Sequence, residues 1–260
     1  MIIAANWKMN PLPSDALALF ESYCSDQRIT QAKSEVICFV PSCYFSLAEQ
    51  SFSSYAVEWG AQNSFPKPSG AFTGELSADM ISGIGGKWVL AGHSERRTQF
   101  GETDAFVAQK LLAGLKSGLR VILCIGEELQ QRQAGLQNAC VRDQLLSGLA
   151  AFCGESTEWQ DKYLRQLVIA YEPVWAIGTG LVAEISQIEV MHSHIHAILR
   201  EQFSSLSARD MPSVLYGGSV KEDNAASIFS LPEVGGALIG GASLSADSFA
   251  AIVSYADKAI

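Results

Sequence analysis

Short runs of hydrophobic residues recur along the chain, and each is followed by a longer segment in which hydrophobic residues return at helical spacing. Most of the short runs are uninterrupted, whereas a strand with one face in water alternates hydrophobic and polar residues. Uninterrupted runs are typical of a parallel sheet that is covered on both faces. Eight strands are predicted in this way, at residues 2–7, 35–41, 56–63, 87–92, 119–126, 166–173, 213–218 and 236–241.

The segments between these runs predict helices. Residues 103–118 place hydrophobic residues on neighbouring turns and end in Gly118, a residue suited to the C-terminal end of a helix. Residues 186–203 repeat hydrophobic residues with the helical period. Within this second segment, Ser186 and Glu189 have the spacing of an N-terminal capping box, so we expect the helix to begin there.

The order of the elements predicts the fold. Eight strand-then-helix units fit the roughly 250 residues of a (β/α)8 TIM barrel, and no linker, low-complexity tract or block of charge divides the chain. We therefore expect residues 1–260 to form a single domain. The alternative is an open doubly-wound sheet, but no G-x-G-x-x-G motif follows the first strand.

Composition narrows the classes of partner. The chain has 260 residues, of which 48% are hydrophobic and 17% charged, an ordinary balance for a globular protein. Its formal net charge is −9, whereas a protein that binds nucleic acid normally has a basic face, so we expect no nucleic-acid partner. An anionic ligand would have to be held by local cations and backbone N–H groups, because the overall field repels it.

Cysteine usage and hydrophobic segments point to a cellular compartment. The six cysteines show neither C-x-x-C spacing nor histidine partners at zinc-like offsets, which favours free thiols and no metal site. The N-terminus has no basic segment before its short hydrophobic run, and no hydrophobic segment approaches the ~20 residues that span a bilayer. We therefore expect a soluble, cytoplasmic protein with no membrane partner.

Polar residues follow several of the predicted strands. Active sites of (β/α)8 barrels are built at the C-terminal ends of the strands, so side chains far apart in the sequence would meet there. The candidates are Asn6 and Lys8 after the first strand, Gln62 and Asn63 after the third, His93 after the fourth, Glu172 after the sixth, and the segments YGGS (216–219) and GGASL (240–244) after the seventh and eighth.

Two of these residues have more than one interpretation. Lys8 is either a surface lysine at a strand end or a cation aimed at an anionic substrate. His93 precedes a predicted helix whose expected cap is Ser94, and the positive end of the helix dipole disfavours a protonated imidazole. A neutral His93 could polarise a carbonyl group, but it could also serve the helix end alone. Arg96 and Arg97 oppose the same dipole, so we expect them to have partners elsewhere.

Glu172 and the glycine pairs indicate further chemistry. Glu172 ends a buried strand and is followed by proline and a hydrophobic loop with glycines, an unusual place for a carboxylate. Glycine pairs mark turns in many proteins. At the ends of the seventh and eighth strands of a barrel, however, they favour a phosphate site. The histidines of residues 192–196 lie within one predicted helix without a carboxylate at metal-binding spacing, so we interpret them as surface or packing residues.

Seven motifs carry a resemblance to one family. They are NWKMN (6–10), AQN (61–63), GAFTGE (70–75), WVLAGHSERR (88–97), AYEPVWAIGTG (170–180), YGGSV (216–220) and GGASL (240–244). In their order and spacing over nearly the whole chain, these motifs closely resemble triosephosphate isomerase. The resemblance implies a (β/α)8 barrel that interconverts dihydroxyacetone phosphate and D-glyceraldehyde 3-phosphate through an enediol(ate), without a metal or an organic cofactor.

The resemblance also assigns roles. Glu172 matches the base that moves the proton, His93 the neutral electrophile, Lys8 the cation near the phosphate, and Asn6 the polar residue beside it, while Glu95 matches the partner of the lysine. The positions that match the phosphate contacts are Gly178, Ser219, Gly240 and Gly241. The positions that match a lid, which closes over the substrate and raises the basicity of Glu172 by excluding water, are Pro173, Val174, Trp175, Ala176, Ile177, Thr179 and Gly180.

The motif GAFTGE resembles the loop through which two subunits of the family interdigitate. The resemblance implies a homodimer with Thr73, Phe72, Glu75 and Arg96 at its interface. The chain departs from the family at Leu181 and Val182, after the lid, and at Gly235, before the last strand. We expect these departures to change the kinetics and the stability rather than the type of reaction, since none of them is a proposed chemical group.

Two rival hypotheses remain open on the sequence. One is a different barrel enzyme that acts on a phosphorylated sugar or aldehyde, but an aldolase of this kind needs a Schiff-base lysine inside a strand, and no strand centre carries one. The other is a catalytically silent barrel retained as a binding protein, although none of the chemical positions is degraded.

Overall fold

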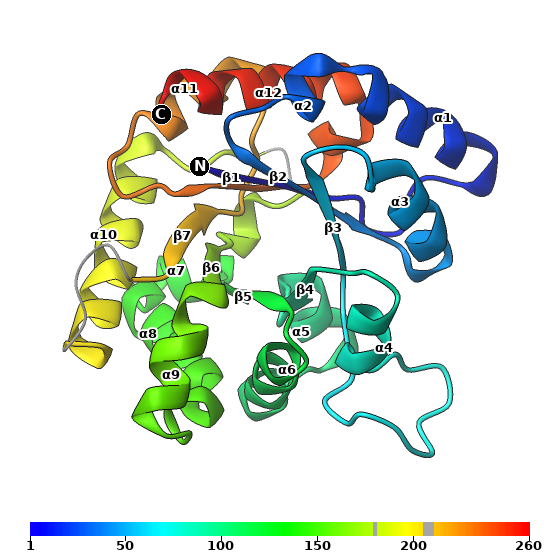
Figure 1. Cartoon of the computed structure of the whole chain (residues 1–260). Coiled ribbons are helices and arrows are strands. Elements are labelled where there is room, and N and C mark those ends of the chain that lie inside the picture. Colours follow the sequence, from blue (N-terminus) through cyan, green and yellow to red (C-terminus); the bar gives the residue numbers. More distant parts are fainter. Residues whose placement is uncertain (179–180, 205–210) are drawn as a thin grey trace.

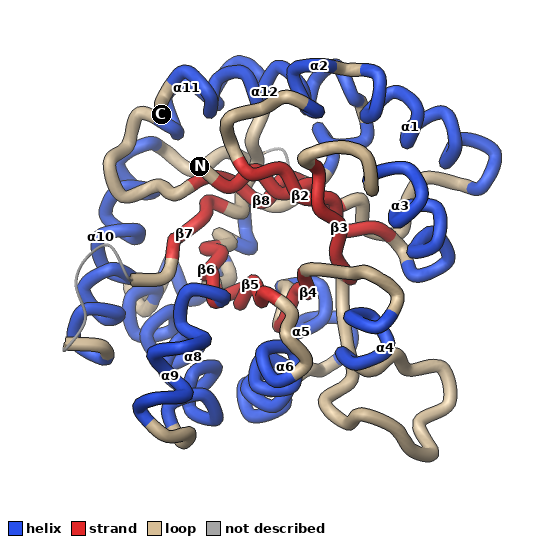
Figure 2. The backbone as a smooth tube through the Cα atoms, in the orientation of Figure 1, coloured by secondary structure: helices blue, strands red, loops and turns tan. Residues whose placement is uncertain are grey.

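A computed structural model of the chain describes residues 1–178, 181–204 and 211–260. Eight parallel strands form a closed barrel in which neighbours in the sequence are neighbours in the sheet, and the first strand pairs with the last (Figures 1 and 2). The strands are β1 (Ile2–Asn6), β2 (Glu35–Val40), β3 (Val57–Ala61), β4 (Trp88–Ala91), β5 (Arg120–Ile125), β6 (Leu167–Tyr171), β7 (Ser213–Tyr216) and β8 (Gly236–Ile239). The predicted (β/α)8 barrel is confirmed, and the alternative of an open doubly-wound sheet is wrong.

Helices surround the barrel and cover its outer face (Figure 1). They are α1 (Pro13–Ser25), α2 (Gln27–Thr30), α3 (Phe45–Phe52), α4 (Ala78–Gly83), α5 (Ser94–Phe100), α6 (Asp104–Lys116), α7 (Leu129–Gln133), α8 (Gln137–Cys153), α9 (Thr157–Tyr163), α10 (Ile185–Gln202), α11 (Glu222–Phe229) and α12 (Ala246–Lys258). Short 3₁₀ helices are η1 (Ser42–Tyr44), η2 (Leu164–Gln166), η3 (Val174–Ala176) and η5 (Gly241–Leu244).

The predicted start of α10 is wrong. The helix begins at Ile185, and its capping box consists of Glu184 and Gln187, with the backbone N–H of Glu184 donating to Oε1 of Gln187 at 3.0 Å. Ser186 and Glu189 instead lie inside the helix. Both pairs have the spacing of a capping box, so the sequence pattern alone does not distinguish the two starts.

Each strand buries both of its faces, which explains the uninterrupted hydrophobic runs. Side chains that point into the barrel form one cluster, and those that point outward pack against the helices in a second, larger cluster. The inner cluster is close-packed around Phe39 and Trp88, because Gly60 between them has no side chain. A Cβ atom at Gly60 would lie 2.6 Å from Cβ of Trp88 and 2.7 Å from the Phe39 ring.

Helix α10 buries one histidine outside the barrel. His192 is fully buried, and its Nδ1 lies 3.1 Å from the carbonyl oxygen of Glu233, which also lies 3.0 Å from Nε2 of His196. Among the described residues, Nε2 of His192 has no hydrogen-bond partner. Burial therefore lowers the pKa of His192 to about 4. The interpretation of His192 as a packing residue is confirmed.

This histidine makes the stability of the fold depend on pH. Between the ordinary pKa of 6.5 and the folded value of about 4, the unfolded chain binds a proton that the folded chain does not. Stability that is present above pH 6.5 is thus lost as the pH falls, by about 2 kcal/mol at pH 5. We expect His192→Gln, which does not titrate, to lose about 2 kcal/mol less than the parent chain between pH 7.5 and pH 5. Urea unfolding at one protein concentration measures this difference, and equal losses in both proteins would contradict it.

Candidate active site

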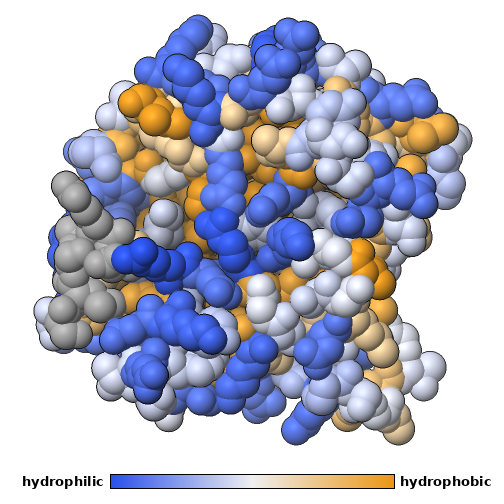
Figure 3. All heavy atoms as spheres, viewed as in Figure 1, coloured by the Kyte–Doolittle hydropathy of each residue, from blue (hydrophilic) through white to orange (hydrophobic). Residues whose placement is uncertain are grey.

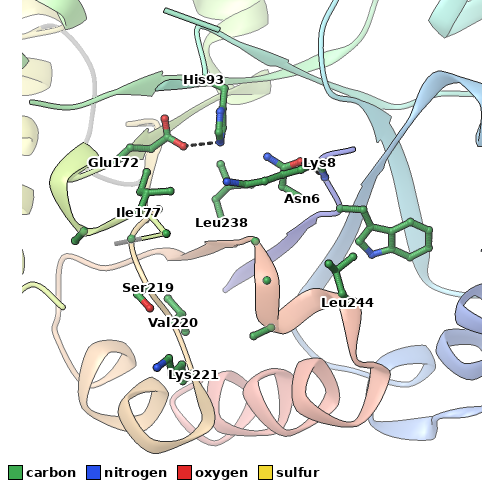
Figure 4. A pocket seen from close by; sticks show the side chains of 18 of the residues that line it. Asn6, Lys8, His93, Glu172, Ile177, Ser219, Val220, Lys221, Leu238 and Leu244 are labelled. Atoms are coloured by element: carbon green, nitrogen blue, oxygen red, sulfur yellow. Dashed lines mark hydrogen bonds and ion pairs between the residues drawn. The ribbon is translucent and has the colours of Figure 1, made fainter. Parts of the chain in front are cut away.

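The C-terminal ends of the strands open into a cavity of about 570 Å³ (Figure 4). Residues from β1, β4, β6, β7 and β8 reach it because all eight strands run parallel and end on the same side of the barrel. The predicted candidates that line this cavity are Asn6, Lys8, His93, Glu172, Ala176, Ile177, Gly178, Ser219, Gly240 and Gly241. Side chains that follow different strands therefore meet in one cavity, as their positions at the strand ends predict.

Lys8 enters the cavity through an unusual backbone turn. Its φ is +53°, and it is the non-glycine residue with positive φ among those the structure describes. Such a conformation costs about 1–2 kcal/mol in an L-residue. The backbone N–H of Lys8 donates to Oδ1 of Asn6 at 3.0 Å, and Nζ donates to Oε1 of Glu95 at 2.5 Å. Figure 4 shows the side chain of Lys8 extending from the end of β1 toward His93 and Glu172.

His93, and not Ser94 as expected, caps helix α5. Its Nδ1 accepts a hydrogen bond from the backbone N–H of Glu95 at 3.2 Å. A nitrogen that accepts cannot also carry a proton, so the neutral ring holds its proton on Nε2. Nε2 lies 3.0 Å from Oε1 of Glu172 and faces the cavity. One helix cap thereby aims a ring N–H into the site.

Glu172 is held by two donors at the end of β6. Its side chain is 2% exposed, Oε1 faces His93, and Oε2 accepts from the backbone N–H of Ser94 at 2.8 Å. A Cβ atom at Gly217 would lie 2.9 Å from Cγ of Glu172, so glycine at that position makes room for the carboxylate. Burial raises the pKa of the Glu172 carboxyl group, and the two hydrogen bonds lower it.

The two pKa values of this pair move oppositely. Burial raises the pKa of Glu172, but His93, the Ser94 N–H and Lys8 lower it by more, so the carboxylate is ionised and a weak base. Burial lowers the pKa of His93, but the carboxylate of Glu172 raises it by more. For His93 this direction is opposite to the one expected from the helix dipole, because that expectation left out the Glu172 carboxylate in direct contact with the ring. The expected rise in the basicity of Glu172 concerns the site with its lid closed over substrate and stays a prediction.

The far side of the cavity is lined mainly by backbone. Gly178 has φ of +69°, and the short helix η5 begins at Gly241. The first N–H groups of a helix have no partner within it and attract anions. A Cβ atom at Gly240 would lie 3.3 Å from Cε of Lys8, so this glycine lets the lysine stem pass. The ammonium group of Lys8, the backbone N–H groups of the glycines and the hydroxyl of Ser219 can together hold a small phosphate group.

The family model for triosephosphate isomerase matches residues 1–256. The chain belongs to the triosephosphate isomerase family. It is 42% identical over 253 residues to the triosephosphate isomerase of Lawsonia intracellularis, with 97% of each chain covered. It is 44% identical to that of Oleidesulfovibrio alaskensis over 97% of this chain and 98% of the relative. It is 43% identical, with the same coverage, to that of Flavobacterium johnsoniae.

In this member of the triosephosphate isomerase family, the segment after Glu172 is anchored to a residue that sequence reasoning missed. Glu127 follows β5, is buried, and accepts from Nε1 of Trp175 at 2.8 Å and from the hydroxyl of Tyr171 at 3.2 Å. Arg132 lies 3.0 Å from the same carboxylate oxygen and stacks on the Trp175 ring, 4.9 Å from its centre. The sequence does contain a signal for Glu127, because this residue directly follows the predicted strand 119–126, and a carboxylate at the end of a buried strand is unusual, as at Glu172.

Most of the remaining lid positions lie in or beside a short helix after Glu172. Pro173 precedes the helix η3, which holds Val174, Trp175 and Ala176, and Ile177 reaches the cavity (Figure 4). Thr179 and Gly180 lie outside the described residues. Leu181 and Val182, which depart from the family pattern, are exposed.

Asn63 and Arg96 do not enter the cavity. Oδ1 of Asn63 accepts from Nζ of Lys110 at 2.6 Å, and Nζ of Lys110 also pairs with Glu102. Arg96 pairs with the same Glu102 carboxylate, so within this chain it contacts a buried charged cluster. Arg97 pairs with Asp104 at 2.5 Å. The expectation that the two arginines have partners elsewhere is confirmed.

The loop that joins β3 to α4 projects away from the barrel (Figure 1). Phe72, Thr73 and Glu75 are exposed on it, and the ring of Phe72 packs on Phe65 with 4.3 Å between their centres. Hydrophobic and weakly polar residues line the lower right of Figure 3, where this loop lies. The tip of this loop therefore presents an aromatic side chain that is 41% exposed.

The described residues contain neither a metal-ligand cluster nor a membrane-spanning helix. No cluster of three or more His, Cys, Asp or Glu able to hold a metal ion occurs in residues 1–178, 181–204 and 211–260. Within the same ranges, no helix combines the length and the hydrophobicity needed to cross a bilayer.

Proposed function

We propose that Glu172, His93, Lys8 and Asn6 carry the chemistry by which this family member interconverts dihydroxyacetone phosphate and D-glyceraldehyde 3-phosphate. This isomerisation is the reaction of the family, in glycolysis and gluconeogenesis. The observation that carries the proposal is the Glu172–His93 pair, in which a buried carboxylate and a ring N–H face one cavity beside a lysine. In the described lining of the cavity, Glu172 is the one carboxylate, and the His93 ring is in direct contact with it.

Binding begins at the phosphate. The chain carries a net charge of −9, so the dianion must be held locally. Lys8 supplies the positive charge, and Gly178, Ser219, Gly240 and Gly241, which line the same cavity, supply N–H and hydroxyl donors. Glu95, which accepts from Nζ of Lys8, orients the ammonium group. The triose is then fixed at one end with its carbon chain directed toward His93 and Glu172.

Glu172 next moves a proton between the two carbons. In its resting position the carboxylate is a weak base, because His93 and the Ser94 N–H stabilise its negative charge. When it turns toward the substrate it leaves both donors, and burial then raises its basicity. It removes the proton from C1 of dihydroxyacetone phosphate, and the C–H electron pair enters an enediolate. The hydroxyl proton on O1 moves to O2, and Glu172 then returns the carbon proton to C2, giving glyceraldehyde 3-phosphate with its carbonyl group at C1.

His93 stabilises the negative charge that develops on the carbonyl oxygen. Once the Glu172 carboxylate has turned away, burial and the N-terminal end of α5 both favour the neutral ring. Its Nε2–H then donates to the substrate oxygens, while Nδ1 stays bound to the N–H of Glu95. The lid residues exclude water from the enediolate, which would otherwise lose its phosphate.

A coupled assay of the purified chain tests this function. The substrate is glyceraldehyde 3-phosphate, and a dehydrogenase reports the dihydroxyacetone phosphate formed through NADH oxidation. We expect kcat/KM near the diffusional ceiling of about 10⁸ M⁻¹s⁻¹. Absence of turnover, with glycerol 3-phosphate still bound in calorimetry, would mean a phosphate-binding barrel without the isomerase chemistry.

We further propose a homodimer, a cytoplasmic location and a single domain of residues 1–260. The exposed loop of Phe72, Thr73 and Glu75 supports the dimer, since it has the family's interface motif. Free cysteines support a reducing compartment. The pairing of β1 with β8 supports one domain, because the two ends of the chain complete one sheet.

The double variant Phe72→Asp, Thr73→Ala tests the dimer. Charging a buried interface side chain costs about 2 kcal/mol or more, so we expect the dimer dissociation constant to rise about 30-fold or more, with a matching loss of activity at low concentration. Sedimentation velocity and the coupled assay measure both effects. Tyr55→Asp is the control, because Tyr55 is 43% exposed and Phe72 is 41% exposed. A fully active monomer would refute the interface.

A further inference from the structure

The strained turn at Lys8 is held in place by a residue that the proposed chemistry does not use. Gln62 follows β3 directly and is partly buried. Its Nε2 donates to the backbone oxygen of Lys8 at 2.8 Å and to the backbone oxygen of Phe39 at 3.1 Å. Both hydrogens of the side-chain amide are therefore used on backbone carbonyls of two other strand ends.

We propose that Gln62 is a positioning residue that fixes the backbone turn of Lys8 and thereby the place of its ammonium group in the phosphate site. This inference rests on the proposed function, because it acts through the phosphate contact of Lys8. Gln62 is the glutamine of the AQN motif, and no step of the isomerisation uses its side chain directly.

The geometry explains why the side chain must be an amide. The register pairs Asn6 of β1 with Phe39 of β2, and Phe39 with Gly60 of β3. Gln62 thus reaches from β3 across β2 to Lys8, the second residue after β1. An amide nitrogen offers two donors to these two carbonyls, whereas a carboxylate of the same size offers acceptors alone. Glutamate at this position would place negative charge against two carbonyl oxygens.

The chain on the other side of Lys8 gives the turn little support. Met9 is 94% exposed, and Asn10 is also exposed. The next contact from another element is the hydroxyl of Tyr44, which donates to the carbonyl oxygen of Pro11 at 2.9 Å. Before the turn, the N–H of Trp7 donates to Phe39 at 3.1 Å. Gln62 therefore holds the peptide between a fixed strand and a solvent-exposed loop.

A small displacement of this peptide has a large effect at the ammonium group. The lysine stem passes Gly240 so closely that a Cβ atom there would lie 3.3 Å from Cε. Its Nζ is bound to Glu95 at 2.5 Å. If the backbone of Lys8 relaxes to an ordinary negative φ, the stem leaves this path and the ammonium group moves away from the phosphate. Misplacement by about 1 Å in an active site can reduce the rate about 10²-fold.

The test is a double-mutant cycle between Gln62→Met and Lys8→Met, measured as the dissociation constant of glycerol 3-phosphate by calorimetry. We expect Gln62→Met to weaken binding about 10-fold and to lower kcat/KM about 10²-fold. In the Lys8→Met background, where the ammonium group is absent, the same change should alter the dissociation constant by less than about twofold. A crystal structure of Gln62→Met should have Lys8 at negative φ.

Gln160→Met is the matched control. The amide of Gln160 also donates to two backbone carbonyls, of Cys153 at 3.2 Å and Glu155 at 2.8 Å, but on the outer shell of the barrel. We expect it to lower the melting temperature without changing the dissociation constant. If Gln62→Met fails to fold, Gln62→Asn takes its place in the cycle, because it keeps the amide and shortens its reach.

Three outcomes would overturn the inference. An unchanged dissociation constant in Gln62→Met would show that the turn needs no such support. An equal loss in both backgrounds would show that Gln62 acts through something other than Lys8. Neither result would affect the proposed function. If Lys8→Met itself binds glycerol 3-phosphate normally, the phosphate role of Lys8 and the inference about Gln62 both fail.

Discussion

Replacement of Glu172 by glutamine is expected to lower kcat by about 10³–10⁴-fold, the largest effect of any single change in this chain. Glutamine keeps the size of the side chain and can occupy the place beside Ser94, but it cannot accept the proton from carbon. The phosphate contacts are untouched, so we expect the dissociation constant of glycerol 3-phosphate to change by less than a few fold. The coupled assay and calorimetry measure the two quantities.

Glu58→Gln is the matched control for this change. Glu58 lies near the opposite end of its strand, on β3, where it accepts from Nε1 of Trp88 at 2.5 Å. The same chemical change at the far end of the barrel should leave kcat within about twofold. Near-normal turnover in Glu172→Gln would remove the proposed base. Weak binding of glycerol 3-phosphate in that variant would mean that Glu172 acts on the structure of the site instead.

The resting pKa values of Glu172 and His93 predict the acid side of the pH profile. A base must be ionised to accept a proton, and the pKa of Glu172 lies below its ordinary value near 4.5 in the free enzyme. The carboxylate should therefore stay ionised in the free enzyme as the pH falls toward 4.5, and a ¹³C NMR titration of Glu172 measures this directly. A loss of kcat/KM nearer neutrality is expected from His93, because its pKa is raised and its neutral ring is the proposed electrophile. A midpoint above 4.5 for Glu172 would contradict its stabilisation by His93 and the Ser94 N–H.

Replacement of His93 by asparagine is expected to lower kcat by about 10²–10³-fold, the usual effect of removing one donor from a developing oxyanion. Asparagine is a good N-cap residue, so it can still accept from the N–H of Glu95 and stabilise α5. Its amide is too short to reach the position of Nε2. The fold should thus be retained while the donor in the cavity is lost.

His93→Leu separates the two roles of this ring. Leucine removes the donor and the cap together, so we expect the same loss in kcat and about 1 kcal/mol less stability than in His93→Asn. Thermal unfolding and the coupled assay supply both numbers. If the two variants are equally stable, the cap at Nδ1 contributes nothing. If His93→Asn retains most of its activity, the ring N–H is not the electrophile.

Much of the fold follows from the hydrophobic pattern, because burial on both faces of a strand leaves a direct record in the sequence. Each predicted strand contains the observed one, and the ends carry the polar and glycine residues of the site. The start of a helix does not follow from the pattern where two capping pairs overlap. At α10, the pairs Glu184–Gln187 and Ser186–Glu189 compete, and the first prevails.

The part of the site that could not be predicted consists of contacts between residues far apart in the chain. Ser94 and Glu172 are 78 positions apart, and Trp175 and Glu127 are 48 apart. Propensities describe each residue in its own segment. They therefore placed His93 at a helix end correctly, yet they gave the wrong net direction of its pKa, which depends on Glu172.

The pairing of β1 with β8 determines when the site comes into existence. Lys8 leaves the end of β1, and Gly240, past which its stem runs, follows β8, so the phosphate site joins the first and the last strand to be synthesised. At 5–20 residues per second, a ribosome needs roughly 10–50 s to complete the barrel after β1 has emerged. During this time β1 has an unpaired edge, which is the kind of surface that aggregates. A nascent chain of this protein is thus exposed to misassembly for most of its synthesis, and it acquires activity in one step at the end.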